Sequence, residues 1–313
     1  MSESISQPEP LPQRSRIRAY LALTRLDRPI GIWLLMWPML WALWFAAGGP
    51  PSLDVLLIFL AGTVLTRSAG CAINDYADRN FDAHVERTRY RPLATGEITP
   101  REALIVAAIL MLLAFCLVLL TNRLTILMSF VALFLAALYP FAKRFTDWPQ
   151  LVLGLAFSWA IPMAYAAQTG AVPRDAWLVF LASVLWAVAY DTMYAMADRE
   201  DDLRIGVKST AILFGDIDIA IVAFVQITVL LTLLLCGNFL GLELLFRSGL
   251  FIALILVIYQ LVLIRKREPV RCIQAFLNNH YLGMIVFIGI VLEYALAHPS
   301  TIADLLSTIG LTI

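Results

Sequence analysis

The sequence predicts an all-α, polytopic membrane protein, and three observations support this prediction. Of the 313 residues, 61% are hydrophobic and only 15% are charged, whereas soluble domains carry about a quarter charged residues. The apolar residues gather in long runs such as Ala103–Leu120 and Ile217–Leu235, close to the roughly 20 residues that span a bilayer as a helix. The 23 basic and 23 acidic side chains cancel, which argues against nucleic acid as a partner. The apolar composition and the long apolar runs indicate that membrane lipid surrounds the protein.

Hydrophobic runs and the breakers between them predict nine transmembrane helices. In chain order the expected spans are 30–47, 53–73, 103–120, 124–141, 151–167, 176–197, 217–236, 249–264 and 282–297. Pro38 and Pro162 lie inside the first and fifth spans, where neighbouring helices can satisfy the backbone groups that a kink releases. Glycine and proline separate the first two spans at 48–51.

Three groups of residues in or beside these spans receive structural interpretations. The first span carries four tryptophans that we expect to face lipid or the membrane interface: Trp33, Trp37, Trp41 and Trp44. A polar triplet enters the last span and is expected to cap its helix: Asn278, Asn279 and His280. The cysteines have no metal-binding spacing and are expected to be structural: Cys71, Cys116, Cys236 and Cys272.

Lysine and arginine predict the orientation. Nineteen of the 23 basic residues lie in the N-terminal segment and in the connections after the even-numbered spans, against three on the other side, Arg123, Arg174 and Arg247. By the positive-inside rule, the N-terminus is expected in the cytoplasm and the C-terminus in the periplasm. The polar first thirteen residues lack the features of a signal or transit peptide, which favours a bacterial inner membrane. The expected organisation is a cytoplasmic segment 1–24, a transmembrane domain 25–300 and a tail 301–313.

Two acidic stripes stand where apolar spans meet the cytoplasmic side. On a helix, the members of the first stripe fall within about 80° of arc and those of the second within about 40°. The first consists of Asn74, Asp78 and Asp82, and the second of Asp191, Asp198 and Asp202.

Magnesium explains these stripes better than ordinary surface acids do. Stacked carboxylates repel each other, and a charge at membrane depth costs roughly 2.5–3.5 kcal/mol. Solvated surface acids would not account for Asp191, which lies inside an apolar span, nor for the same arrangement occurring twice. Mg²⁺ prefers a few carboxylate oxygens and completes its shell with water and substrate phosphate. The stripes therefore predict a magnesium-dependent phosphate site.

Cations near the stripes support this prediction. Basic loops follow both stripes, at 87–96 and at 204–210, where Lys208 lies, and Lys143 and Arg144 lie on the same side. Arg and Lys offset the charge of a diphosphate. Arg67 is two turns deeper on the face of the first stripe and has two interpretations: a buried ion pair with Asp191, or recognition of a polar group of an acceptor. The sequence leaves both open.

These residues resemble the paired aspartate motifs of the UbiA-type intramembrane prenyltransferases. The matching patterns are Asn74-Asp75-x-x-Asp78-x-x-x-Asp82 and Asp198-x-x-x-Asp202. Longer strings at 28–44, 70–88, 138–146 and 186–215 are similar to the branch that prenylates 4-hydroxybenzoate. The resemblance runs from about Arg25 to Tyr294.

The resemblance implies nine helices around a central cavity, with the active site on the cytoplasmic side. The implied reaction is Mg²⁺-dependent transfer of a polyprenyl group from polyprenyl diphosphate to the ring carbon ortho to the hydroxyl of 4-hydroxybenzoate, in ubiquinone synthesis. Asn74, Asp78 and Asp82 are expected to hold one Mg²⁺, and Asp198 and Asp202 the second.

The remaining expected roles concern the two substrates. Arg79, Lys143 and Arg144 are expected to meet the diphosphate or the acceptor. Tyr139, Tyr190 and Tyr194 have two interpretations, stabilisation of an allylic cation by their ring faces or a packing role, and both stay open. Two alternatives remain at this stage. A cation transporter would also place carboxylates at membrane depth, but near the midplane. A related enzyme would prenylate another acceptor, such as homogentisate, a naphthoate or haem.

Overall fold

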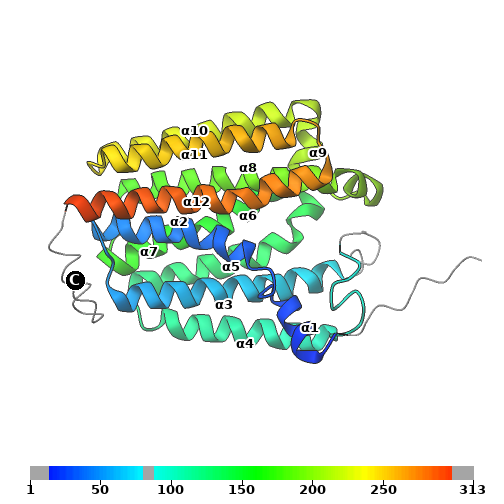
Figure 1. Ribbon diagram of the computed structural model, residues 1–313. Helices are drawn as coiled ribbons and strands as arrows, with labels where there is room; N and C mark the ends of the chain where they lie inside the picture. Colours follow the sequence, from blue (N-terminus) through cyan, green and yellow to red (C-terminus); the bar gives the residue numbers. More distant parts are fainter. Residues whose placement is uncertain (1–13, 80–87, 298–313) are drawn as a thin grey trace, which may run out of the picture.

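The protein is a single helical bundle. The computed structural model describes residues 14–79 and 88–297, without the side chain of Lys143. Within this part every regular element is helical, and nine helical segments are long and apolar enough to cross a membrane. The all-α, nine-span prediction is therefore confirmed, and the chain is a multi-pass membrane protein. The long helices run side by side (Figure 1).

The elements are as follows in chain order. They are α1 (Arg16–Leu23), α2 (Ile30–Ala47), α3 (Leu53–Asp78), α4 (Pro100–Val118), α5 (Arg123–Phe145), α6 (Pro149–Ser158), α7 (Ala160–Thr169), α8 (Arg174–Ile205), α9 (Thr210–Phe214), η2 (Gly215–Ile217), α10 (Asp218–Phe239), α11 (Leu244–Ile264) and α12 (Pro269–Ala297).

Three helices are longer than the apolar spans that revealed them. α3 continues to Asp78, α8 continues to Ile205, and α12 already begins at Pro269. Hydropathy detects only the part of a helix that is apolar all round, so the polar ends of these helices fall outside the expected spans. The prediction that residues 278–280 cap the last helix is therefore wrong, because they lie in its interior. Asn279 is buried and accepts a hydrogen bond from Trp186 Nε1 at 2.8 Å.

The fifth span is broken into α6 and α7 at Trp159. Pro162 has no N–H to donate to the carbonyl of Ser158, so the helix cannot continue regularly there. The break is tied to α5, since Trp159 Nε1 donates to the carbonyl oxygen of Met128 at 3.0 Å. Pro38, by contrast, lies within the continuous helix α2.

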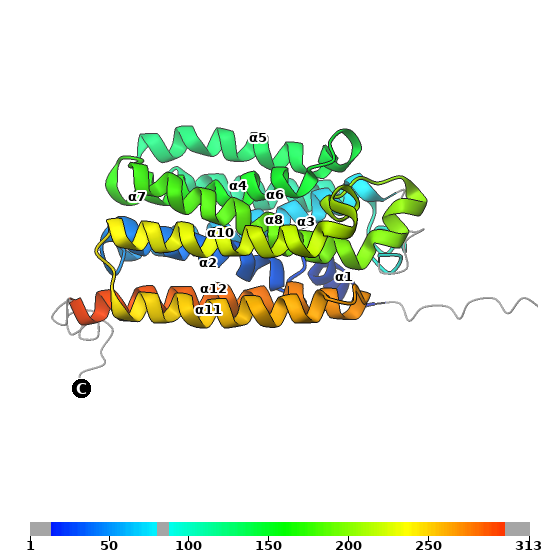
Figure 2. The same cartoon turned by 90° about the horizontal axis from the view of Figure 1, so that it is seen from above.

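Helix α8 lies inside the bundle, with α4 and α5 to one side of it and α10 and α11 to the other in Figure 1, and between α5 and α11 in Figure 2. It packs against α2, α6, α7, α10 and α12. Its approach to α6 needs a glycine, because a Cβ at Gly154 would lie 2.9 Å from the carbonyl oxygen of Val184. Small residues at such crossings let helix backbones approach closely within a membrane.

The tryptophans of α2 are partly in the core. Trp37 and Trp41 are buried, so the expectation that they face lipid is wrong for both; Trp33 alone of the four is exposed. Trp41 stacks on Trp186, with ring centroids 5.3 Å apart, and donates to the carbonyl oxygen of Gly283 at 3.1 Å. Trp37 Nε1 donates to His280 Nδ1 at 3.1 Å. Each buried indole N–H thus has an acceptor on α12, which allows these aromatic side chains to pack inside.

Side chains accept hydrogen bonds from the backbone amides at two helix beginnings. Helix α4 starts with a capping box in which Thr99 and Glu102 exchange hydrogen bonds. Glu102 also binds Arg16 and accepts from the Tyr20 hydroxyl at 3.1 Å, which fixes α1 beside α4. At the opposite end of the bundle, Glu293 of α12 accepts from the first backbone amides of α11. The contacts of Glu102 with Arg16 and Tyr20 hold α1 near the candidate site described below.

Candidate active site

A cavity of about 810 Å³ opens at the end of the bundle where α1 and α9 lie. The turn between α1 and α2 contributes to its wall, as do α3, α5, α6, α8, α12 and the two loops at 88–92 and 205–209. Ten of the residues expected from the sequence to form the site line it: Arg67, Asn74, Asp78, Tyr139, Tyr190, Asp191, Tyr194, Asp198, Asp202 and Lys208.

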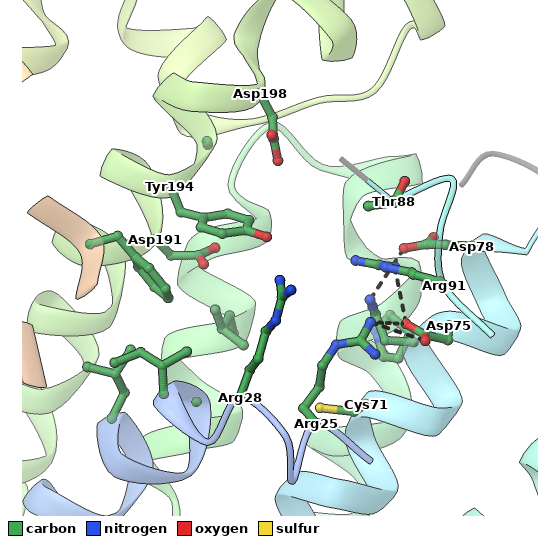
Figure 3. A pocket seen from close by; sticks show the side chains of 18 of the residues that line it. Arg25, Arg28, Cys71, Asp75, Asp78, Thr88, Arg91, Asp191, Tyr194 and Asp198 are labelled. Atoms are coloured by element: carbon green, nitrogen blue, oxygen red, sulfur yellow. Dashed lines mark hydrogen bonds and ion pairs between the residues drawn. The ribbon is translucent and has the colours of Figure 1, made fainter. Parts of the chain in front are cut away.

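The two acidic stripes face each other across this cavity. Asp78 projects from α3 on one wall, and Asp191 and Asp198 project from α8 on the other (Figure 3). On α3, Asn74 Nδ2 donates to Asp78 Oδ2 at 3.4 Å, one helical turn away. Each stripe lies on a helix that continues an apolar span. Its oxygen atoms therefore line one face of that helix, from the apolar part to the polar end of the bundle.

Some expected site residues are not on the lining. Asp82 and the side chain of Lys143 lie outside the described residues. Arg79 packs over the ring of Tyr76, 4.3 Å from its centroid, and donates to the Tyr76 carbonyl at 2.7 Å. Arg144 donates to the carbonyl oxygen of Ala77 at 2.7 Å, near the C-terminal end of α3, where cations are favoured. Both arginines lie beside the α3 wall rather than on the surface of the cavity.

Arg67 lies at the deep end of the cavity. Its Nη1 is 3.0 Å from Cys71 Sγ, and its guanidinium lies 5.4 Å from the ring centroid of Phe157. Its Nε is buried and has no hydrogen-bond partner within the described part of the chain. A buried donor of this kind is unfavourable unless a ligand satisfies it. Cys71 lines the cavity beside it, in addition to the structural role expected of it.

Buried hydrogen bonds fix the end of the loop that carries Lys208. The backbone amide of Thr210 donates to Gln150 Oε1 at 3.0 Å, and the Thr210 and Thr192 hydroxyl oxygens are 2.6 Å apart. Lys208 itself pairs with Asp147 at 3.2 Å. These contacts join α6, α8 and the start of α9, so the loop has a defined place at the rim.

Six charged residues on the lining were not assigned to the site from the sequence: Arg14, Arg25, Asp27, Arg28, Asp75 and Arg91. Arg28 reaches into the space between the two walls (Figure 3). In the sequence, the four arginines contribute only to the predicted orientation of the chain or to a basic loop. Their position at the membrane boundary, just before the first span or just after the first stripe, is the sequence feature that could have indicated a role in the site.

The oxygen donors of the cavity fit a Mg²⁺ ion whose coordination shell is completed by a substrate. No three acidic, histidine or cysteine side chains converge closely enough to enclose a metal ion by themselves, within residues 14–79 and 88–297. The donors on both walls are carboxylate and amide oxygens, which this cation prefers. Mg²⁺ is commonly bound by one or two carboxylates, with waters and phosphate oxygens in the remaining positions. Two separated half-sites facing one cavity are consistent with that mode.

Comparison with known proteins identifies the family. A model of the UbiA prenyltransferase family matches residues 35–288. The chain belongs to this family. The 4-hydroxybenzoate octaprenyltransferase of Ectopseudomonas mendocina (strain ymp) is 58% identical over 277 residues, which are 88% of this chain and 94% of that protein. The protein of the same name from Aeromonas salmonicida (strain A449) is 58% identical over 283 residues, 90% of this chain and 98% of that protein.

Solved structures of UbiA homologues share the fold. The apo structure of a homologue from Aeropyrum pernix K1 has a TM-score of 0.74 at 24% identity and covers 83% of this chain and 97% of that chain. A homologue from Archaeoglobus fulgidus bound to GPP and Mg²⁺ has a TM-score of 0.64 at 20% identity, covering 87% of this chain and 99% of that one. At these identities the likeness concerns the fold alone.

Proposed function

We propose that this UbiA-family transferase moves a polyprenyl group from polyprenyl diphosphate to the ring carbon ortho to the hydroxyl of 4-hydroxybenzoate, as a step of ubiquinone synthesis. The observation that carries the proposal is a single cavity that receives both acidic stripes and is rimmed by cations. The relatives that are 58% identical are named for 4-hydroxybenzoate as substrate and for an octaprenyl group.

The diphosphate end of the donor belongs at the acidic rim. We assign one Mg²⁺ to Asn74, Asp78 and Asp82 and a second to Asp198 and Asp202, and Mg²⁺ bound there neutralises the charge of the departing diphosphate. Arg28 and Lys208, both on the lining, add positive charge. Such preorganised charge favours cleavage of the allylic C–O bond, because negative charge develops on the leaving oxygen.

The aromatic side chains act on the allylic carbon, the other atom of the bond that breaks. Tyr139, Tyr190 and Tyr194 line the same cavity. Their ring faces attract a cation, so they are suited to stabilise the allylic carbon as positive charge develops on it. The surrounding helices keep this carbon away from water, which would otherwise capture it.

The acceptor belongs at the deep end. The buried Nε of Arg67 is a donor that a carboxylate can satisfy. Asp191 lines the same cavity, and its carboxylate can accept a hydrogen bond from a polar group of the acceptor. Held there by its carboxylate, 4-hydroxybenzoate directs its phenol ring toward the allylic carbon. The ring carbon ortho to the hydroxyl forms the new bond and then loses its proton, which restores aromaticity.

We assign the catalytic unit to residues 25–300, flanked by segments 1–24 and 301–313, and place the cavity on the cytoplasmic side of a bacterial inner membrane. The asymmetry of lysine and arginine supports this orientation. The N-terminus is then cytoplasmic and the C-terminus periplasmic. In this orientation a small acid enters from the cytoplasm, and the prenyl tail stays in the membrane.

The test is incubation of the purified protein with 4-hydroxybenzoate, a polyprenyl diphosphate and Mg²⁺, followed by mass spectrometry. The expected product has the mass of the acceptor plus the prenyl group less one hydrogen. Parallel reactions with homogentisate and a dihydroxynaphthoate measure the acceptor preference. A higher kcat/KM for either alternative, or no product with 4-hydroxybenzoate while another acceptor is consumed, would reject the assigned acceptor.

A further inference from the structure

Asp75 follows Asn74 of the first acidic stripe in the sequence but is not a member of that stripe. Its side chain is 1% exposed. Arg25 Nη2 donates to both carboxylate oxygens of Asp75, at 2.9 and 3.1 Å, and Arg91 Nη1 lies 3.2 Å from Oδ1. The three side chains form one cluster at the rim of the cavity (Figure 3). Asp75 thus joins segments that are 50 and 16 residues away in the chain.

Arg25 reaches Asp75 from an unusual backbone conformation. Helix α1 ends in a Schellman motif, in which Arg25 N donates to the Ala22 carbonyl and Leu26 N to the Leu21 carbonyl. Arg25 occupies the left-handed position, with φ of +56°. Glycine adopts this conformation without strain, whereas a residue with a side chain does not. A functional need for the guanidinium at this place, beside Asp75, would explain why the position is not a glycine.

Arg91 is held by a folded loop rather than by a helix. Its amide donates to the Thr88 carbonyl at 2.9 Å and its carbonyl accepts from Thr95 N at 3.0 Å. The loop is anchored by Ile98, which is buried among apolar side chains of α1, α3 and α4. Asp75 is therefore where α3, the turn after α1 and this loop meet.

We propose that Asp75 is a positioning residue, which holds Arg25 and Arg91 at the cavity rim where the donor diphosphate binds, and that it is not a metal ligand. The inference rests on the proposed function. Two guanidinium groups repel each other, and a buried carboxylate between them removes that repulsion and fixes their orientation. A guanidinium has five N–H donors, so an arginine that binds a carboxylate can also bind phosphate. The cluster thus presents two oriented arginines to one diphosphate.

A second cluster of the same construction provides a matched control. Asp218, at the start of α10, is 0% exposed and binds Arg267 Nη2 at 2.7 Å and Arg199 Nη1 at 3.6 Å. Arg267 also has a positive φ, of +55°. Neither arginine is among the described residues that line the cavity. Replacing Asp218 therefore disrupts an equivalent buried cluster without affecting arginines of the proposed donor site.

The experiment compares Asp75→Asn with Asp218→Asn in the full-length protein. Asparagine keeps the shape of the side chain but cannot neutralise two arginines. We expect Asp75→Asn to raise both the KM for polyprenyl diphosphate and the inhibition constant of inorganic pyrophosphate by about tenfold, the effect of losing one charge-assisted contact. The KM for 4-hydroxybenzoate and the half-saturating Mg²⁺ concentration should change less than about twofold on the same scale. Asp218→Asn should lower the melting temperature without these kinetic changes.

Arg25→Gly is a second variant that tests the arginine itself and leaves the Asp75 carboxylate in place. It removes the guanidinium but relieves the left-handed strain, and Arg91 continues to pair with Asp75. We expect this variant to fold and to show the same donor-specific increase in KM.

Three outcomes would overturn the proposal. A changed Mg²⁺ requirement with an unchanged donor KM would make Asp75 a metal ligand. Loss of stability alone in Asp75→Asn would make the cluster structural. Normal donor binding by Arg25→Gly would remove Arg25 from the site. Failure of the wild-type protein to prenylate 4-hydroxybenzoate would instead contradict the proposed function, so the two failures are distinguishable.

Discussion

Replacement of Arg67 by alanine should weaken the acceptor site selectively. Its guanidinium lies at the deep end of the cavity, and its buried Nε has no partner in the part of the chain that the structure describes. A hydrogen bond to a charged group contributes about 1.5–3 kcal/mol, which corresponds to a roughly ten- to hundredfold change in affinity. We expect Arg67→Ala to raise the KM for 4-hydroxybenzoate by that factor, with little effect on the KM for polyprenyl diphosphate.

A glycine on the facing helix allows the same group to be displaced without removing its charge. A Cβ on Gly31 would lie 2.4 Å from Arg67 Nε and 2.5 Å from Nη2. The guanidinium is the end of a flexible side chain, so Gly31→Ala should shift it rather than the backbone. We expect the same acceptor-specific increase in KM. Gly62→Ala is the matched control, because a Cβ at Gly62 has no atom within 4 Å.

The assay is steady-state kinetics with each substrate varied at saturating Mg²⁺ and saturating co-substrate. An acceptor that has a carboxamide in place of the carboxylate should be used poorly by the wild-type protein, and Arg67→Ala should discriminate less between the two. Equal effects on both substrates, with stability restored in Arg67→Ala combined with Asp191→Ala, would refute the reasoning. That result would mean that Arg67 serves mainly to pair with Asp191.

Three further predictions concern the metal site, the orientation and the fold. Asp78→Ala or Asp198→Ala should abolish turnover while the melting temperature is kept or raised, because each removes a proposed ligand and relieves repulsion between carboxylates. A cysteine placed within 88–100 should react with an impermeant thiol reagent only from the cytoplasmic face, and one at Ser300 only from the periplasmic face. Glu293→Ala should lower stability by about 1.5–3 kcal/mol, measured by thermal unfolding, because two amides at the start of α11 lose a charged acceptor.

Each of these predictions has a control or a contrary outcome. Turnover near the wild-type rate in Asp78→Ala at saturating Mg²⁺ would contradict the two-metal assignment. Labelling from the opposite faces would reverse the orientation and the route proposed for the acceptor. For Glu293 the control is Glu243→Ala, which removes an exposed glutamate at the same helix start that makes no capping hydrogen bond. Equal effects of the two glutamate substitutions would exclude the capping role.

The number and order of the spans could be predicted because hydropathy reports directly on insertion into a membrane. The ends of the helices could not. Residues 269–281 belong to α12, but they are too polar to count as part of an apolar run. The burial of Trp41 was also beyond the sequence, because it depends on a hydrogen bond to Gly283, 242 residues away. A tryptophan in an apolar run has no local signal that separates lipid contact from packing.

The acidic stripes could be predicted because helical periodicity places residues four apart on one face. That the stripes on α3 and α8 share one cavity is a tertiary fact, and only the repetition of the pattern hinted at it. Asp75 is part of the matching sequence pattern, but its role could not be predicted, for a different reason. Its charge is neutralised by Arg25 and Arg91, and no spacing rule connects these residues. Sequence reasoning therefore favours residues that form a local pattern over those that depend on distant partners.

The depth of each polar group explains how one cavity can accept both a lipid and an acid. The stripes extend beyond the apolar part of α3 and α8, so most of their charge lies at the polar end of the bundle. Arg67 lies deeper, surrounded by Phe157 and the tyrosines that line the walls. An isolated charge at that depth is unfavourable in lipid but tolerable in a cavity that a ligand fills. A diphosphate at the rim and a carboxylate at Arg67 then fix the two ends of the reacting pair, and the allylic carbon must lie between them, beside the aromatic rings.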